Sequence, residues 1–186
     1  RRDHRLLLFL YNSGARADEA AQLAIANLTL FPPASVTIVG KGGRTRHCPL
    51  WDTTADVVKP AVEGRDVQER VFLNRCKRPI TRFGIHTMVE RYVSKVSAEL
   101  PSLASKQICP HTIRHTTAVH LLRAGVDINT IRAWLGHVSI DTTNIYAEVD
   151  LEMKGRALAK CDVGETDQPS HRWSEDSSLM AFLRSL

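Results

Sequence analysis

Apolar residues recur at helical spacing in both halves of the chain, and a short β-branched stretch separates these two regions. A nearly continuous apolar run predicts a buried helix over about residues 3–12, and spaced alanine and leucine positions predict a second helix over about residues 17–26. The short turn between them, residues 14–16, contains Arg16. We therefore expect a positive charge at a tight corner between two apolar helices.

The stretch after the second helix is typical of a β-hairpin. Residues 36–39 are β-branched, residues 40–43 contain Lys41 among three glycines, and residues 44–50 can return as the partner strand. The pattern therefore predicts a hairpin with a lysine at its tip.

The rest of the chain is dominated by helix signals. Capping residues, apolar spacing and glycine stops define most of these elements. The expected elements are a helix from Thr53 or Thr54 towards Glu63, a short strand at residues 71–73, a helix capped by Thr81 that runs to about residue 100, a helix over about residues 111–124, a helix capped by Asp127 that ends at Gly136, and a short helix that starts at Ser139 or Asp141. The apolar face of the helix after Thr81 is expected to contain Ile85, Met88, Val89, Tyr92 and Val96. The whole pattern predicts a mainly α fold with a small antiparallel β-sheet (α+β).

The composition is that of an ordinary globular chain and excludes a disordered, collagen-like or coiled-coil protein. Of the 186 residues, 43% are hydrophobic and 24% are charged, and the formal net charge is +5. This basic excess is compatible with nucleic-acid binding but favours it only slightly. No apolar run approaches the roughly 20 residues needed to span a bilayer, so we expect no membrane partner.

The cysteines and histidines do not form a metal-binding pattern. The four cysteines are scattered without a CxxC pair, which fits reduced thiols better than a disulfide framework or a zinc site. His111 and His115 have the spacing of half a zinc site, but Thr112 stands where the HExxH motif has glutamate, and no third ligand has a matching spacing. We expect no metal and no cofactor.

The end of the chain differs in composition from the rest. Residues 161–178 include Gly, Pro, Ser and five acidic residues, which is typical of a linker, and residues 179–186 form a short amphipathic segment. The expected organisation is a domain over residues 1–160, a polar linker over 161–178 and a helical tail over 179–186. Docking of this tail on a neighbouring protomer and folding back on its own domain are both open.

Several residues along the chain suit phosphate chemistry when they are taken together. They are Arg16, Lys41, His111, Arg114, His137 and Tyr146. Guanidinium groups match the geometry of phosphate oxygens, histidine and lysine can donate or move protons, and a phenol can attack phosphorus. Each residue alone is explained more simply as a surface charge, a turn residue or a packed helix residue. Only the combination favours phosphoryl transfer.

The combined pattern resembles the catalytic domain of the tyrosine recombinase (phage integrase) family. Residues 111–146, HTIRHTTAVHLLRAGVDINTIRAWLGHVSIDTTNIY, are similar to the family signature HxLRH…LLxxG…I…LGH…TTxxY. Upstream, YNSGARADEAAQL is similar to the TGxRxxEL box, and VGKGGRTRHCPL is similar to the hairpin motif GKGxKxRxxPL. The resemblance extends in order over residues 1 to about 150, and the ordered set is much more specific than any single box.

The resemblance implies a role for each matched position. Arg16 and Arg114 match catalytic arginines, Glu19 matches the acid that supports Arg16, and Lys41 matches the hairpin lysine that protonates the leaving 5′ hydroxyl. The other matches are His111 of the HxxR pair, His137 as the second histidine, His115 in a less defined role, and Tyr146 as the nucleophile that forms a 3′-phosphotyrosyl bond.

The resemblance also implies the activity, which is that of a site-specific DNA recombinase of the integrase or transposase type. Such enzymes cleave and rejoin strands by transesterification and use neither ATP nor a metal. Two other classes stay open: a type IB topoisomerase-like enzyme that relaxes DNA, and a catalytically silent DNA-binding module.

The implied partners are double-stranded DNA and other recombinase protomers in the bacterial cytoplasm. We expect a tetramer on DNA and a monomer or weak oligomer off it, and we expect the family's N-terminal DNA-clamping domain to be missing from this chain. Spare cations are candidates for phosphate contacts. They are Arg44, Arg46, Arg75, Lys77, Arg78, Arg82 and Lys106.

Overall fold

The computed structural model describes residues 2–136, which belong to the compact unit Arg1–Asp150. The short helix predicted to start at Ser139 or Asp141, the linker at 161–178 and the tail at 179–186 lie outside the described residues. The boundary predicted at residue 160 lies there as well.

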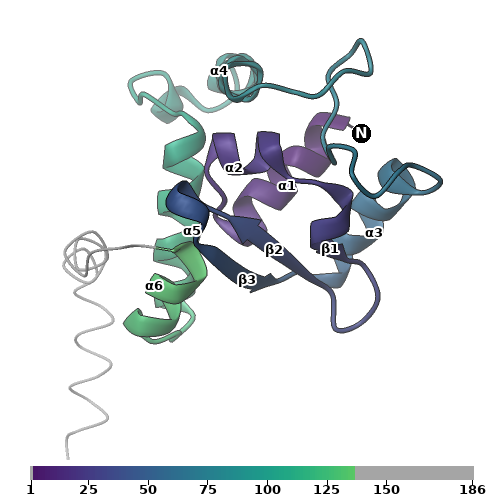
Figure 1. Cartoon of the computed structure of the whole chain (residues 1–186). Coiled ribbons are helices and arrows are strands. Elements are labelled where there is room, and N and C mark those ends of the chain that lie inside the picture. Colours follow the sequence, from purple (N-terminus) through teal and green to yellow (C-terminus); the bar gives the residue numbers. More distant parts are fainter. Residues whose placement is uncertain (1, 137–186) are drawn as a thin grey trace, which may run out of the picture. The chain divides into compact units, whose positions relative to one another are not determined.

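The described elements are mainly helices, with one small sheet (Figure 1). In chain order they are α1 (Arg2–Ser13), α2 (Ala17–Gln22), η1 (Ile25–Asn27), β1 (Leu28–Thr29), β2 (Ser35–Val39), η2 (Lys41–Gly43), β3 (Thr45–Pro49), α3 (Asp52–Val62), α4 (Arg82–Ser97), η3 (Pro101–Leu103), α5 (Pro110–Arg123) and α6 (Ile128–Leu135). The sheet is antiparallel with the order β1-β2-β3. The predicted α+β fold with a small antiparallel sheet is therefore confirmed.

The core forms around α1. Leu6, Phe9 and Leu10 share one face of this helix and are buried, as the apolar run predicts. Helix α1 packs against α3 and α5, and Figure 1 shows it behind the sheet. The rings of Phe9 and Phe72 lie 5.1 Å apart, so the connection that follows α3 closes over the same core.

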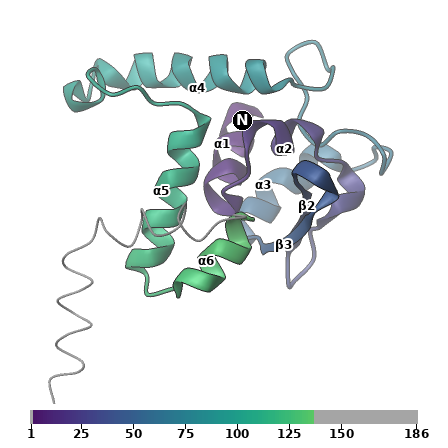
Figure 2. The same ribbon diagram turned by 60° about the vertical axis from the view of Figure 1, so that its left-hand side comes forward.

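The hairpin of β2 and β3 has one buried face and one exposed face. In its register Val36 pairs with Cys48 and Ile38 pairs with Arg46, and all four are buried. The exposed residues alternate with them, because successive side chains of a strand point to opposite faces. Helix α6 packs against β3, as Figure 2 shows, so the buried face of the hairpin meets the end of the helical part.

The predicted caps of the later helices are confirmed. The Thr81 hydroxyl accepts a hydrogen bond from the backbone N–H of Gly84 at the start of α4. The Asp127 carboxylate accepts from the backbone N–H groups of Asn129 and Thr130, both at 3.0 Å, at the start of α6. Gly136 ends α6 with a φ of 64°, the left-handed conformation that glycine adopts without strain.

The helix predicted over residues 17–26 is too long. Helix α2 ends at Gln22, and Leu23 is already extended. The backbone N–H of Val71 donates to the Leu23 carbonyl at 2.9 Å, and Ala24 forms an isolated bridge with Arg70. Pairing with this distant segment overrides the local helical preference. The strand predicted at residues 71–73 is also wrong: this segment is a connection in which Leu73 forms a single isolated bridge with Pro79.

Two smaller predictions also need correction. Helix α3 begins at Asp52 after Trp51, and Thr54 is a buried residue inside it rather than its cap. On α4 the residue Val96 is exposed, although Ile85 and Met88 on the predicted face are buried. Within residues 2–136 no helix has both the length and the apolar character needed to cross a membrane.

Candidate active site

The corner between α1 and α2 lies against the end of α6. Gly14 has a φ of +59°, a left-handed conformation that favours glycine. A Cβ placed on Gly14 would clash with Cδ2 of Leu135, the last residue of α6. Glycine at position 14 therefore lets α6 come this close to the corner. Arg16 lies two residues later and immediately precedes α2.

Arg114 on α5 links this corner to α6. Only 1% of the residue is exposed. Its guanidinium donates hydrogen bonds to the carbonyl oxygens of Gly14 and Leu135, both at 2.5 Å. Burial of a charge is unfavourable unless hydrogen bonds compensate it, and these two carbonyls supply that compensation. They also fix the plane of the guanidinium between two separate segments of backbone.

Glu19 on α2 contacts two arginines. Its carboxylate accepts hydrogen bonds from the backbone N–H of Arg16 at 2.8 Å and from Nη1 of Arg16 at 2.9 Å. Nη1 and Nη2 of Arg46 donate to its two oxygens at 3.0 and 2.6 Å. The Arg16 side chain is 45% exposed, whereas those of Glu19 and Arg46 are 6% and 8% exposed. A buried ion pair thus holds an exposed arginine.

The electrostatics of this pair strongly favour the ionised carboxylate. Burial raises the pKa of Glu19, but hydrogen bonds from Arg46 and Arg16, with the charge of Arg46, outweigh it and lower the pKa to about 2. Glu19 is therefore negative at neutral pH and fixes both guanidinium groups.

Two histidines stand one turn apart on α5. The rings of His111 and His115 have centroids 4.3 Å apart. Burial lowers the pKa of His111, and the charges of His115, Arg114 and Arg16 lower it further. Burial and the charge of Arg114 also lower the pKa of His115. Both imidazoles therefore favour the neutral form.

Lys41 lies at the tip of the hairpin, as predicted from its glycine-rich turn. It is exposed and begins the η2 turn. The preceding residue, Gly40, is close to the buried ion pair: a Cβ placed on it would lie 3.4 Å from Oε1 of Glu19 and 3.8 Å from Nη1 of Arg46. The base of the hairpin tip is thus packed against the same ion pair that holds Arg16.

The structure brings together much of the set expected from the sequence. Arg114 binds the carbonyl of Gly14, two residues before Arg16, and His111 lies about one turn before Arg114 on α5. Gly40, which precedes Lys41, lies beside the ion pair of Glu19 and Arg46. His137 and Tyr146 lie outside the described residues. Within residues 2–136 no group of three or more His, Cys, Asp or Glu side chains could hold a metal ion.

Arg46 was expected to contact DNA, and the structure contradicts this. The strand alternation turns its side chain into the interior, where both of its Nη groups are used by Glu19. The signal was present in the sequence, because Arg46 and the apolar Cys48 are two residues apart on one strand and must share a face. The other six candidates are exposed: Arg44, Arg75, Lys77, Arg78, Arg82 and Lys106.

Three of these exposed cations, Arg75, Lys77 and Arg78, lie in the loop that leads into α4, and Arg82 is the first residue of that helix. Asn74 orders this loop, because its side-chain oxygen accepts hydrogen bonds from the backbone N–H groups of Cys76 and Arg78 at 2.8 and 3.1 Å. The guanidinium of Arg82 lies 4.7 Å from the ring of the exposed Phe83. The loop therefore presents its charges from a defined backbone.

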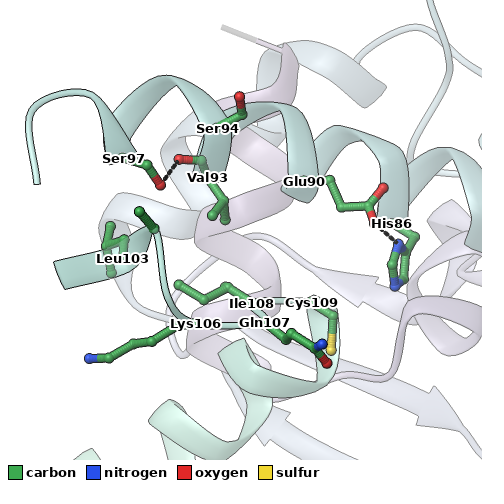
Figure 3. Close-up of a pocket in the computed structure, with 11 residues that line it drawn as sticks. His86, Glu90, Val93, Ser94, Ser97, Leu103, Lys106, Gln107, Ile108 and Cys109 are labelled. Atoms are coloured by element: carbon green, nitrogen blue, oxygen red, sulfur yellow. Dashed lines mark hydrogen bonds and ion pairs between the residues drawn. The ribbon is translucent and has the colours of Figure 1, made fainter. Parts of the chain in front are cut away.

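A groove lies elsewhere on the described part of the chain. It has a volume of about 770 Å³ and lies between α4 and the segment 103–109 (Figure 3). Its wall includes the ion pair of His86 with Glu90, 3.3 Å apart, and Lys106. None of the candidate catalytic residues in 2–136 lines this groove, although the DNA-binding candidate Lys106 does.

Comparison with known proteins identifies the family. The sequence matches the profile of the phage integrase family over residues 1–153. A protein provisionally named integrase/recombinase y4rC, from Sinorhizobium fredii, is 36% identical over 188 residues, which cover 100% of this chain and 56% of the relative. Tyrosine recombinase XerD from Staphylococcus saprophyticus is 32% identical over 155 residues, 80% of this chain and 50% of the relative. The chain thus spans about half the length of these relatives.

Solved structures share the fold. XerA recombinase has a TM-score of 0.68 at 21% identity and covers 87% of this chain and 63% of its own. The catalytic domain of bacteriophage HP1 integrase has a TM-score of 0.57 at 20% identity, with 88% of this chain and 84% of its own covered. The fold is that of a tyrosine recombinase catalytic domain. The chain belongs to the phage integrase family.

Proposed function

We propose that this chain is the catalytic part of a site-specific DNA recombinase of the integrase or transposase type. The phenol oxygen of Tyr146 loses its proton to solvent and attacks the phosphorus of a phosphodiester, and the bond from phosphorus to the 5′ oxygen breaks. This leaves a 3′-phosphotyrosyl ester and a 5′ hydroxyl. A 5′ hydroxyl of a partner strand then attacks the ester, releases Tyr146 and rejoins the DNA. The ester retains the phosphodiester bond energy, so the reaction requires no ATP.

The other residues act on the charge and the protons of this reaction. Arg16, Arg114 and His137 bind the non-bridging oxygens of the phosphate, and Lys41 protonates the leaving 5′ oxygen. His111 stands beside Arg114 on α5 and supplies a further hydrogen-bond donor. Side-chain cations neutralise the phosphate, so the proposal includes no metal.

The observation that carries this proposal is the fixed guanidinium of Arg114, which binds the corner that contains Arg16 and lies about one turn from His111 on α5. Arg114 is oriented by the carbonyls of Gly14 and Leu135, and Arg16 is oriented by Glu19. Donors that are already in place stabilise developing charge without reorganisation during the reaction. The names of the relatives support the same activity, since they are recombinases and integrases.

We also propose how the chain binds DNA and how its protomers assemble. The exposed cations of the loop before α4, with Arg44, Arg82 and Lys106, contact DNA phosphates, and each such contact adds about −0.9 to the salt slope of binding. Protomers assemble as a tetramer on DNA, and the reaction takes place in the bacterial cytoplasm.

Covalent capture tests this function without knowledge of the target site. The chain is incubated in EDTA with a pool of nicked duplex oligonucleotides of random sequence, so that the cleaved end diffuses away and the ester persists. Covalent adducts are separated by denaturing gel electrophoresis, and their DNA is sequenced. We expect adducts that share a sequence motif. The control is Tyr146→Phe, which should bind the recovered duplex and form no adduct.

Other outcomes separate the remaining classes. Relaxation of supercoiled plasmid by a monomer, without recombinant product on paired sites, indicates a topoisomerase-like enzyme. Binding without any adduct indicates a silent DNA-binding module. An adduct that persists in Tyr146→Phe contradicts the assigned nucleophile.

A further inference from the structure

Arg46 occupies a position that its neighbours on the hairpin do not share. It lies on the buried face of β3, and two of its nitrogens bind the two oxygens of Glu19 at 3.0 and 2.6 Å. This two-point geometry fixes both the distance and the orientation of the carboxylate. The positive charge of Arg46 is paired with the carboxylate of Glu19, which favours a role inside the protein.

The carboxylate that Arg46 holds is the same one that holds Arg16. Oε1 of Glu19 accepts from Nη1 of both arginines, and Oε2 accepts from Nη2 of Arg46 and from the backbone N–H of Arg16. Glu19 therefore cannot rotate towards Arg46 or away from it without changing its contact with Arg16. The position of the exposed Arg16 guanidinium depends on the buried one.

Two glycines place Arg46 against the segments that lead to other candidate residues. A Cβ on Gly136 would lie 3.1 Å from Cδ and 3.3 Å from Nη1 of Arg46, so the end of α6 packs directly on this side chain. Gly136 immediately precedes His137 in the sequence. Gly40, which precedes Lys41, lies beside the same ion pair.

A neighbouring contact also joins β3 to α6, so that β3, the start of α2 and the end of α6 form one junction. The Sγ of Cys48, two residues along β3 on the same buried face, donates to the Trp134 carbonyl at 3.3 Å. Strand β3 thus touches both the start of α2 and the last turn of α6. The side chain of Arg46 is the charged group at the centre of this junction.

We propose that Arg46 is a positioning residue for the cleavage reaction, which orients Arg16 through Glu19 and supports the backbone that leads to Lys41 and His137. The inference rests on the proposed recombinase function. It assigns Arg46 no contact with DNA or with the reacting phosphate.

The test compares two arginine–glutamate pairs in the same chain, the buried pair of Arg46 with Glu19 and the more exposed pair of Arg65 with Glu69. Arg46→Met removes the positioning group and keeps much of its volume. Arg65→Met is the matched control, because Arg65 also binds a glutamate, Glu69, at 3.1 Å and donates to the carbonyl of Ala61 at 2.9 Å, but contacts none of the candidate catalytic residues. Both variants are expected to lower the melting temperature measured by circular dichroism.

The deciding readout is the single-turnover rate of adduct formation at saturating DNA, with the nicked duplex recovered by covalent capture, at a temperature where both variants are folded. Arg46→Met should be slower than the wild type by about 100-fold, the order of loss expected when a catalytic group is displaced by about 1 Å. Arg65→Met should cleave at the wild-type rate. Arg46→Lys should fall between, because lysine keeps the charge and loses the two-point contact.

The salt dependence of binding separates positioning from DNA contact. Arg46→Met should keep the wild-type salt slope, whereas loss of a phosphate contact reduces its magnitude by about 0.9. A reduced slope, or a wild-type cleavage rate in folded Arg46→Met, overturns the positioning role. If Arg46→Met does not fold, Arg46→Lys decides: slower cleavage supports the role and a wild-type rate overturns it.

The same experiment distinguishes failure of this inference from failure of the proposed function. If the wild-type chain forms no adduct, the recombinase assignment fails and the positioning role fails with it. If the wild type and all the variants form adducts at one rate, the recombinase assignment stands and only the positioning role is wrong.

Discussion

The buried carboxylate of Glu19 should make folding depend on pH in a defined range. Its pKa falls from the ordinary 4.5 to about 2 in the folded chain. This difference of about 2.5 pH units, at about 1.4 kcal/mol for each unit, corresponds to a stabilisation of about 3 kcal/mol at neutral pH. Because the folded-state pKa is the lower one, the stabilisation is present above pH 4.5 and is lost as the pH falls towards about 2.

Glu19→Gln tests this reasoning, because an amide keeps the size of the side chain and cannot ionise. The free energy of unfolding, measured by urea denaturation with circular dichroism, should be about 3 kcal/mol lower than that of the wild type at pH 7. This difference in the free energy of unfolding should become smaller as the pH falls from about 4.5 to about 2, because Glu19 of the wild type becomes neutral in that range.

The matched control is Glu69→Gln. The side chain of Glu69 is 49% exposed and pairs with Arg65 at 3.1 Å. Exposed pairs contribute about 0–1 kcal/mol, so this variant should stay close to the wild type at every pH. If Glu19→Gln is as stable as Glu69→Gln at pH 7, or if its gap from the wild type does not change with pH, the reasoning is refuted.

Three further predictions follow from the corner and from α5. Arg114→Ala should lower the adduct-formation rate by about 10³- to 10⁵-fold at saturating DNA, and a loss below tenfold would exclude a catalytic role. Gly14→Ala should destabilise the chain by about 2–4 kcal/mol in urea denaturation, because a Cβ clashes with Leu135 and the φ is +59°. The control Gly64→Ala, with a φ of +72° and open space around it, should cost about 1–2 kcal/mol. DNA binding should take up protons, because a bound phosphate raises the lowered pKa of His111. The affinity for DNA, measured by fluorescence anisotropy, should therefore increase as the pH falls from about 8 to about 6. This increase should be smaller in His111→Gln.

Local signals predicted the helical part of this fold well. Thr81 and Asp127 cap their helices through their own side chains, and Gly136 ends α6 through its own conformation. Such features depend on a few consecutive residues, so they can be identified without knowledge of the fold. The extended conformation of Leu23 has a different cause, since it comes from backbone pairing with Val71 across a long stretch of chain. No local pattern contains that information.

The candidate site likewise has features that local sequence predicts and features that depend on the fold. The motif spacing identified Arg16, His111 and Arg114, and the structure links Arg114 to the corner that contains Arg16 through the carbonyl of Gly14. It did not reveal that the carbonyls of Gly14 and Leu135 fix Arg114, because backbone acceptors have no signature in sequence. Arg46 was misassigned because a count of cations does not distinguish the two faces of a strand. Successive side chains of a strand alternate between its two faces, so the apolar Cys48, two residues later, indicates that Arg46 lies on the buried face. A charged side chain there needs a partner of opposite charge.

The central claim is that Tyr146 carries the DNA in a covalent intermediate. Mass spectrometry of trypsin- and nuclease-digested adducts tests it directly, because the tryptic peptide 133–154 contains Tyr146 as its single tyrosine. The account predicts a nucleotide joined through its 3′ phosphate to Tyr146 in this peptide. A nucleotide on any other residue, or an unmodified peptide from chains that have cleaved DNA, would contradict it.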